Sequence, residues 1–200
     1  MTQATRQLLH VGCGARANPR LPACFRAPSW REIRLDIDPA VQPDIVASIC
    51  DLHMVADASI DAVFSSHNLE HLETFDVPRA LAEFHRVLRP DGYALITLPD
   101  LRAIALHIAA DRLDTPLYQS AAGAISPLDV LFGHQAALAA GRRHMAHRTG
   151  FTATTLGRSL LAAGFHEVRV HEGRRWDLWA LASMPATGAA VWQELAQVMQ

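Results

Sequence analysis

Five short apolar runs in the first half of the chain each end in residues typical of a ligand-binding turn. These turn residues are Gly12 with Gly14, Asp36, Asp51 with Leu52, Ser66 to Asn68, and Pro99 with Asp100. Short apolar runs bounded by glycine, proline and aspartate are typical of buried strands. When such strands are parallel, their carboxyl ends lie along one edge of the sheet, where ligands bind. The chain is therefore predicted to form a Rossmann-like, doubly wound α/β sheet with a binding site at that edge.

About seven strands are expected. They cover residues 7–11, 32–36, 45–49, 62–66, 93–98, 165–170 and 176–182. The last two are joined by a short turn around Gly173, and so tight a connection favours an antiparallel hairpin at one edge of the sheet. We therefore expect a mostly parallel sheet whose seventh strand is antiparallel.

The clearest helix is predicted at residues 77–88, where apolar residues recur at intervals of four, three and four residues from Val77. A second helix is expected between Thr152, a candidate N-cap, and Gly164, and a third at residues 189–199. Prolines 19, 22 and 28 interrupt the segment after the first strand. The long helix usual at that point is therefore expected to be short or missing.

Residues 101–150 break the alternation of strands and helices and follow the fifth strand as an insert. Helices are expected at residues 101–110 and 128–140, and prolines 116 and 127 mark breaks. Inserts of this kind often form lids or substrate walls. We expect one domain over residues 1–200, in which the insert is a helical lid or an acceptor-binding segment.

Composition argues against several classes of function. Hydrophobic residues make up 50% of the chain and charged residues 19%, as in globular proteins. The formal net charge of -2 supplies no basic field for nucleic acid, and no apolar run is long enough to cross a bilayer. The three cysteines are scattered and no secretory signal is recognised, so a cytoplasmic location is expected.

The eleven histidines raise the question of a metal site. His67 and His71 are four residues apart, but they lack the Glu-Xaa-Xaa-His setting of metalloproteases. His144 and His147 lie beside three arginines, which would repel a cation. No metal ligand is therefore predicted. The same arginines suit a carboxylate or phosphate, so an anion site and a solvated basic surface both stay open.

The motifs, taken in order, resemble those of the class I S-adenosylmethionine-dependent methyltransferases. Residues 9–14 (Leu-His-Val-Gly-Cys-Gly) resemble the first motif of this family, and residues 35–39 (Leu-Asp-Ile-Asp-Pro) resemble the second. The most specific similarity joins residues 68–72 (Asn-Leu-Glu-His-Leu) to residues 86–92 (Arg-Val-Leu-Arg-Pro-Asp-Gly). The resemblance covers residues 7–100 well and 150–182 loosely, and it leaves the insert uncovered.

This resemblance implies S-adenosylmethionine as the cofactor. Gly12 and Gly14 would let its methionine part lie against the backbone. Asp36 would accept hydrogen bonds from the ribose hydroxyls, since a carboxylate is an acceptor only. Asp51 would meet the adenine amino group, with the N–H of Leu52 beside it.

Ser66 is the remaining cofactor-binding candidate, and other residues are candidates for the chemistry itself. By the same resemblance, Ser66 and His67 would lie near the sulfonium and the incoming acceptor. His67 and His134 are predicted as general-base candidates, with Asp100 as a third. A base is needed only if the acceptor must lose a proton early in the reaction.

Two positions depart from the family pattern. His10 stands where the family has an acid for the methionine ammonium group, and Arg16 stands where it has a third glycine. A dinucleotide needs a helix N-terminus for its pyrophosphate, whereas S-adenosylmethionine has no phosphate. The broken helix after the first strand therefore favours S-adenosylmethionine.

We predict an enzyme, an S-adenosylmethionine-dependent methyltransferase. Its acceptor is expected to be a small molecule, anionic if the basic cluster binds it, or a group on a larger molecule. A cofactor-binding scaffold or sensor without catalysis is the alternative, motivated by His10. An NAD(P)-dependent oxidoreductase is disfavoured. The sequence leaves the acceptor and the oligomeric state open.

Overall fold

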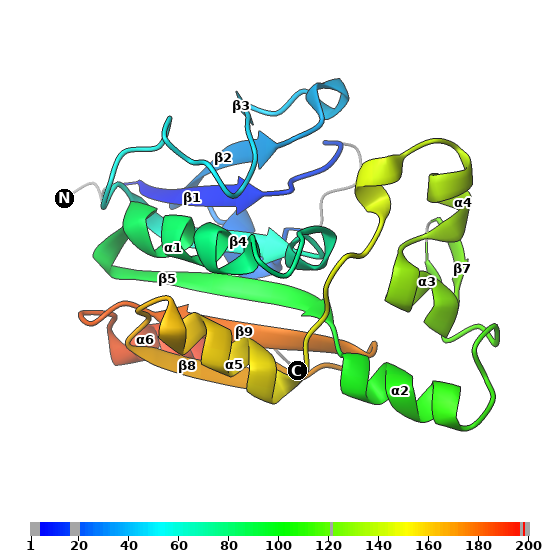
Figure 1. The fold of residues 1–200 in the computed structure, drawn as a ribbon. Coiled ribbons are helices and arrows are strands. Elements are labelled where there is room, and N and C mark those ends of the chain that lie inside the picture. The colour runs from blue at the N-terminus through cyan, green and yellow to red at the C-terminus, as the bar shows by residue number, and fades with distance from the viewer. Residues whose placement is uncertain (1–4, 17–20, 121, 197, 199–200) are drawn as a thin grey trace.

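The computed structural model describes residues 5–16, 21–120, 122–196 and 198, which include one seven-stranded sheet with helices on both faces (Figure 1). The strands are β1 (Arg6–Val11), β2 (Trp30–Asp36), β3 (Ile45–Val46), β4 (Ile60–Ser66), β5 (Leu88–Pro99), β8 (Glu167–Glu172) and β9 (Asp177–Ser183). Their order across the sheet is β3-β2-β1-β4-β5-β9-β8. The pairs among β1 to β5 are parallel, whereas β9 runs antiparallel to both β5 and β8. The predicted fold class, including its antiparallel seventh strand, is confirmed.

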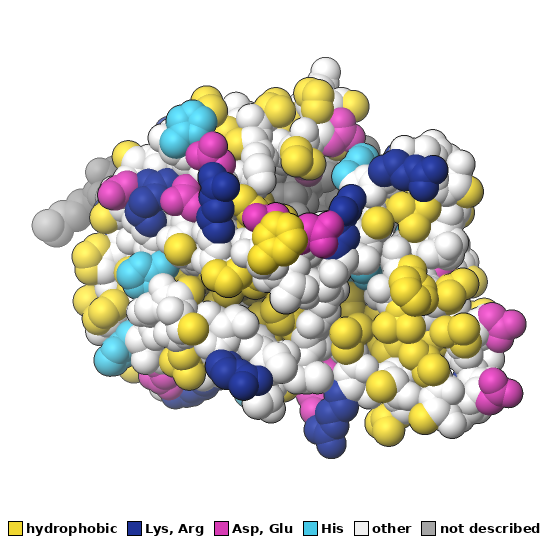
Figure 2. Space-filling model, in the orientation of Figure 1, with side chains coloured by type: hydrophobic (Ala, Val, Ile, Leu, Met, Phe, Trp, Pro, Cys, Tyr) yellow, Lys and Arg dark blue, Asp and Glu magenta, His cyan; other side chains and the backbone are white. Residues whose placement is uncertain are grey.

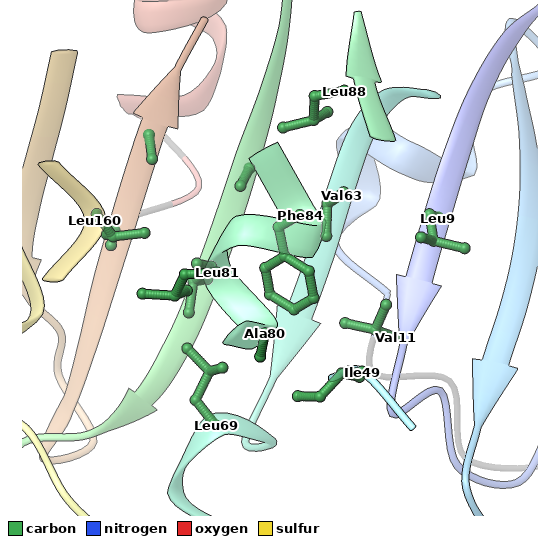
Figure 3. Close-up of a cluster of buried hydrophobic side chains, with 14 of the residues drawn as sticks. Leu9, Val11, Ile49, Val63, Leu69, Ala80, Leu81, Phe84, Leu88 and Leu160 are labelled. Carbon is green, nitrogen blue, oxygen red and sulfur yellow. The ribbon is translucent and has the colours of Figure 1, made fainter. Parts of the chain in front are cut away.

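Alternate residues of the strands pack on opposite faces of the sheet, as the two-residue period of a strand requires. Leu9 and Val11 of β1 lie in the larger core with Phe84 of α1 (Val77–Val87), and α5 (Ala153–Ala162) adds Leu160 to it (Figure 3). A smaller cluster on the other face includes Leu8, Phe25, Trp30, Phe64, Tyr93 and Leu195 of α6 (Ala189–Ala196). Both faces of the sheet are therefore covered, which leaves its edge for binding.

The predicted helices occur with small shifts of boundary. Helix α1 has Pro78 in its first turn, and α5 begins with a capping box between Thr152 and Thr155. Gly164, with φ of +102°, follows α5. Between Leu21 and Trp30 the chain forms only a short 3₁₀ turn in place of a long helix. Residues 19, 197 and 199, on which predictions also fell, lie outside the described residues.

Most predicted strands differ from the observed ones by one or two residues at an end, and two predictions are wrong by more. Strand β5 begins at Leu88 rather than at residue 93, because α1 ends in an extended residue that pairs directly with Ile60 of β4. Strand β3 contains only Ile45 and Val46 rather than residues 45–49. Ile49 is apolar because it packs in the core and not because it belongs to the sheet. An apolar residue in the sequence therefore does not show by itself whether it belongs to a strand or only packs in the core.

The insert contains more elements than predicted. These are α2 (Leu101–Ala109), the hairpin β6 (Tyr118–Ser120) with β7 (Gly123–Ile125), α3 (Pro127–Phe132) and α4 (Gln135–Ala139). The single helix predicted at residues 128–140 is wrong, because Gly133 separates α3 from α4. Its φ is +94°, and a Cβ at this position would collide with the carbonyl of Met145. The chain therefore turns there, and the turn brings His134 to the start of α4.

Charged and hydrophobic side chains are distributed unevenly over the face of the molecule drawn in Figure 2. The face drawn in Figure 2 intersperses acidic and basic side chains over the sheet domain and gathers hydrophobic ones over the insert. Exposed apolar residues of the insert include Leu106, Leu113 and Phe132. In the part of the chain that the structure describes, the helices are too short or too polar to cross a membrane.

Candidate functional site

Hydrogen bonds join the turn after β1 to the end of β2. Gly12 and Gly14 have φ values of +60° and +61°, a conformation that favours glycine. Asp36 Oδ2 accepts a hydrogen bond from the N–H of Gly14 at 2.9 Å, and Oδ1 accepts one from the N–H of Asp38 at 3.0 Å. Each oxygen keeps a further lone pair. Asp36 can therefore position the glycine turn and still accept hydrogen bonds from a pair of ligand hydroxyls.

Arg34 supports the same turn, and the sequence analysis missed it. Its side chain is buried, Nη2 donates to the carbonyl of Gly14, and Nη1 donates to the carbonyl of Gln42 at 3.2 Å. The guanidinium thus ties the glycine turn to the segment after β2. An arginine on a strand is normally solvent-facing, so only the structure could reveal this role.

The glycine turn also lies against the loop after β4. A Cβ on Gly12 would lie 2.8 Å from atoms of the Asn68 side chain, so this close approach needs glycine. No described atom lies within 4 Å of the corresponding position on Gly14. The amide Nδ2 of Asn68 is buried and has no hydrogen-bond partner among the described residues. A ligand thus has room at Gly14 and an unused donor near Gly12.

Asp51 and Leu52 follow β3, but both are engaged within the chain. His53 Nδ1 lies 2.9 Å from Asp51 Oδ1, and this hydrogen bond holds the pKa of the Asp51 carboxyl below its ordinary value. The N–H of Leu52 donates to Glu83 Oε2 at 2.6 Å. Contact between adenine and this N–H would therefore require Glu83 to move away.

Position 10 has a carboxylate beside it, supplied by the neighbouring strand. His10 is buried in β1, with Nδ1 2.6 Å from Glu32 Oε1 of β2. Burial lowers the pKa of His10 by more than the hydrogen bond to Glu32 raises it. His10 is therefore neutral near pH 7. Burial likewise raises the pKa of the Cys13 thiol to about 11, so this thiol stays protonated and is a poor nucleophile.

A cavity of about 860 Å³ lies between the sheet edge and the insert. Ser66 and His67 line it from the end of β4, and His134 lines it from the start of α4. The structure thus brings these three predicted residues together. Gly12, Gly14, Asp36, Asp51 and Leu52 are not part of its lining. Gly12 lies close to Asn68, which follows the lining residue His67 in the chain.

The cavity lining is aromatic and basic where the β8–β9 turn meets the insert. The rings of Tyr118 and Trp176 stack, with centroids 6.0 Å apart and an interplanar angle of 11°. Arg142, Arg174 and Arg175 also line the cavity and take part in none of the ion pairs found among the described residues. The predicted basic cluster at residues 142–148 is therefore divided. Part of it joins the cavity, while Arg148 pairs with Glu73.

A buried carboxylate with three histidines around it lines the same cavity. Glu70 is 1% exposed, and neither carboxylate oxygen has a hydrogen-bond partner among the described residues. His67 Nδ1 lies 3.3 Å from Glu70 Oε1, an ion-pair distance without the alignment of a hydrogen bond. The rings of His71 and His147 are 4.8 Å apart and belong to the same group.

The histidines keep this carboxylate ionised. Burial by itself raises the pKa of Glu70, but His67, His71 and His147 outweigh burial and hold it below its ordinary value. Burial also lowers the pKa of His147. The ionised carboxylate of Glu70 thus lies beside the neutral imidazole of His147. The sequence analysis missed Glu70, because a glutamate next to a turn is ordinarily solvated.

Residues 9–96 match the family model for the methyltransferase domain. Over these residues, which make up less than half of the chain, the sequence is similar to that domain. The cofactor of this family is S-adenosylmethionine. The matched range ends before the insert, so the family match does not include the part of the cavity lining that the insert supplies.

Several solved structures share the fold of this chain. An S-adenosylmethionine-dependent methyltransferase from Archaeoglobus fulgidus is 14% identical, with a TM-score of 0.60 over 90% of this chain and 87% of that chain. One from Aquifex aeolicus is 15% identical, with a TM-score of 0.56 over 92% and 85%. The 1,6-didemethyltoxoflavin-N1-methyltransferase of Burkholderia thailandensis, bound to 1,6-didemethyltoxoflavin and S-adenosylhomocysteine, is 19% identical, with a TM-score of 0.53 over 92% and 72%. No curated protein sequence matches the chain significantly.

The geometry around the glycine turn fits such a cofactor. Gly14 offers a clear approach to the backbone, and both oxygens of Asp36 keep lone pairs for hydroxyl donors. Asn68 adds a buried donor without a partner among the described residues. An orphaned donor of this kind is costly unless a ligand satisfies it.

Proposed function

We propose that the chain transfers a methyl group from S-adenosylmethionine to a small-molecule acceptor bound in the 860 Å³ cavity. The observation that carries this proposal is the place of the cavity beside the cofactor turn. Ser66 and His67 line the cavity, and the next residue, Asn68, packs on Gly12. A volume of this size suits a small ligand.

Each cofactor-binding residue has a proposed role that its surroundings support. Gly12 and Gly14 lie against the methionine part of the cofactor, and Asp36 accepts the two ribose hydroxyls. The exposed carboxylate of Asp51 accepts the adenine amino group. Leu52 offers its N–H to adenine only when Glu83 has released it, so Asp51 is the more important of the two.

The acceptor is proposed to be planar and anionic. Stacked aromatic rings suit a flat acceptor, and arginine side chains suit a carboxylate or phosphate. Tyr118 and Trp176 supply the rings, and Arg142 with Arg174 supplies the positive charge. The insert thus serves as the acceptor-binding part of one domain over residues 1–200. The free thiols of all three cysteines agree with the cytoplasmic location expected from the sequence.

The chain mainly has to align donor and acceptor and exclude water, since a sulfonium methyl group is already activated. Ser66 lies at the strand end next to the cofactor turn, where it can contact the reacting groups. His67 is the first candidate for taking a proton from the acceptor. Its φ is +50°, an uncommon conformation for a residue other than glycine. Such conformations cluster at functional sites, and His134 is the second candidate.

Calorimetry with S-adenosylmethionine and S-adenosylhomocysteine tests the cofactor part of the proposal. Asp36→Ala removes a charged acceptor and should weaken binding by roughly tenfold to a hundredfold. Asp91→Ala is the matched control, because Asp91 is an exposed acid near the amino end of β5, away from the binding edge. Undiminished binding by Asp36→Ala, or no binding by the wild type, would refute the assignment.

Methyl transfer itself is tested with radiolabelled cofactor and a panel of planar aromatic acids. Arg142→Ala should raise KM for an anionic acceptor and leave cofactor affinity unchanged, since Arg142 lines only the acceptor side. Tight binding of S-adenosylhomocysteine without turnover of any acceptor would favour the scaffold or sensor function instead. Binding of NAD(P)H in preference to S-adenosylmethionine would favour the oxidoreductase.

A further inference from the structure

Two distant segments of the chain are fastened together beside the cavity. The N–H groups of Arg148 and Thr149 donate to the carbonyl of Glu70 at 2.8 and 3.2 Å. The hydroxyl of Thr74 donates to that of Thr149 at 3.1 Å, and Arg148 pairs with Glu73, each across 75 residues of sequence. These bonds hold the loop after β4 against the end of the insert. They bring together side chains that the sequence analysis treated separately.

Two histidines at this junction have their ring orientation fixed by backbone carbonyls. His71 Nδ1 lies 3.1 Å from the carbonyl oxygen of Ala146, and His147 Nδ1 lies 2.7 Å from that of Val130. A carbonyl only accepts hydrogen bonds, so each Nδ1 carries the proton and each Nε2 presents a lone pair. Metal-binding histidines are oriented by the same kind of hydrogen bond.

Glu70 completes a set of three donors. Its carboxylate is buried and both oxygens lack a hydrogen-bond partner among the described residues, an arrangement that is costly unless a cation or donor satisfies it. One ligand atom from each of Glu70, His71 and His147 lies within 4.8 Å of the other two. We propose that these three residues bind one divalent transition-metal ion, with Zn²⁺ as the best match to two imidazoles and a carboxylate.

The proposed site is open on one side. Ligands of a tetrahedral zinc ion lie about 3.4 Å apart, so the three side chains must close by roughly an ångström on binding. Three protein ligands leave at least one coordination position, and Glu70, His71 and His147 all line the cavity. Water or a donor atom of the acceptor can take that position. The two histidine pairs noted in the sequence, His67 with His71 and His144 with His147, did not predict this site. The reason is that His147 faces Glu70 rather than the arginines next to it in the chain.

Metal binding is measured directly on the tag-free wild-type protein after treatment with a chelator. Titration with Co²⁺, followed by visible absorption, and with Zn²⁺, followed by elemental analysis, should give one ion per chain. X-ray absorption of the zinc form should show two imidazole nitrogens and oxygen ligands. Absence of a bound ion, or a sulfur ligand at the zinc, would overturn the proposal.

Variants then assign the ligands. His71→Ala and His147→Ala should each weaken Zn²⁺ binding by more than roughly a hundredfold, since even second-shell changes cost tenfold to a hundredfold. His144→Ala is the control, because His144 is exposed in the same segment and lies outside the group. Glu70→Gln keeps the shape of the side chain and should also lose binding. Equal affinity in the wild type and His147→Ala would overturn the assignment. Cofactor binding is measured separately, so failure of the metal site leaves the proposed methyl transfer standing.

Discussion

Replacing Arg34 with methionine tests whether a buried guanidinium holds the glycine turn after β1 in place. Arg34 is 3% exposed and donates to the carbonyls of Gly14 and Gln42. Two hydrogen bonds from a charged donor contribute about 1.5–3 kcal/mol each. The methionine variant no longer buries a charge, and this gain offsets part of the loss. We expect a net destabilisation of about 2–4 kcal/mol, which for a chain of this size lowers Tm by on the order of 10 °C.

The assay is urea unfolding followed by circular dichroism, together with calorimetry for S-adenosylhomocysteine. Arg34→Met should lower the unfolding midpoint with little change in m, and should weaken ligand binding by roughly tenfold because the Gly14 carbonyl loses its anchor. Arg31→Met is the matched control, since Arg31 is exposed on the same strand. A midpoint equal to that of the control would refute the reasoning, because the two carbonyls would then need no guanidinium.

Two further predictions concern pH and the insert. The pKa of His10 is lowered by burial despite its contact with Glu32, so the unfolded chain binds more protons and stability should fall as pH drops through about 6.5. Between pH 7.5 and 5.5, the free energy of unfolding measured in urea should fall more for the wild type than for His10→Phe. Equal falls would contradict a buried neutral imidazole at this position. Gly133→Ala should destabilise the insert by at least about 1 kcal/mol, because its Cβ meets the carbonyl of Met145 at a positive φ. Gly141 also has a positive φ, but no described atom lies within 4 Å of the position its Cβ would take. Hydrogen exchange in the insert should therefore change less for Gly141→Ala than for Gly133→Ala.

The local patterns of the sequence determined the sheet and its binding edge. The apolar runs of β1, β2 and β4, each ending in glycine, aspartate or serine, predicted these strands and their ligand-binding ends. The apolar stripe of α1 and the Thr152 cap of α5 predicted two helices that pack on one face. These features follow from periods of two and 3.6 residues and from capping, which depend only on near neighbours in the chain.

The tertiary structure alone decided which side chains support the glycine turn and which meet in the cavity. Arg34 is an ordinary charged residue in sequence and becomes the anchor of the glycine turn once its strand is buried on both sides. Glu70 and His71 meet His147 only because backbone hydrogen bonds join segments 75 residues apart. Such contacts depend on how the insert packs on the sheet edge. No local propensity encodes that packing, so the sequence predicted the sheet edge while the tertiary structure formed the cavity beside it.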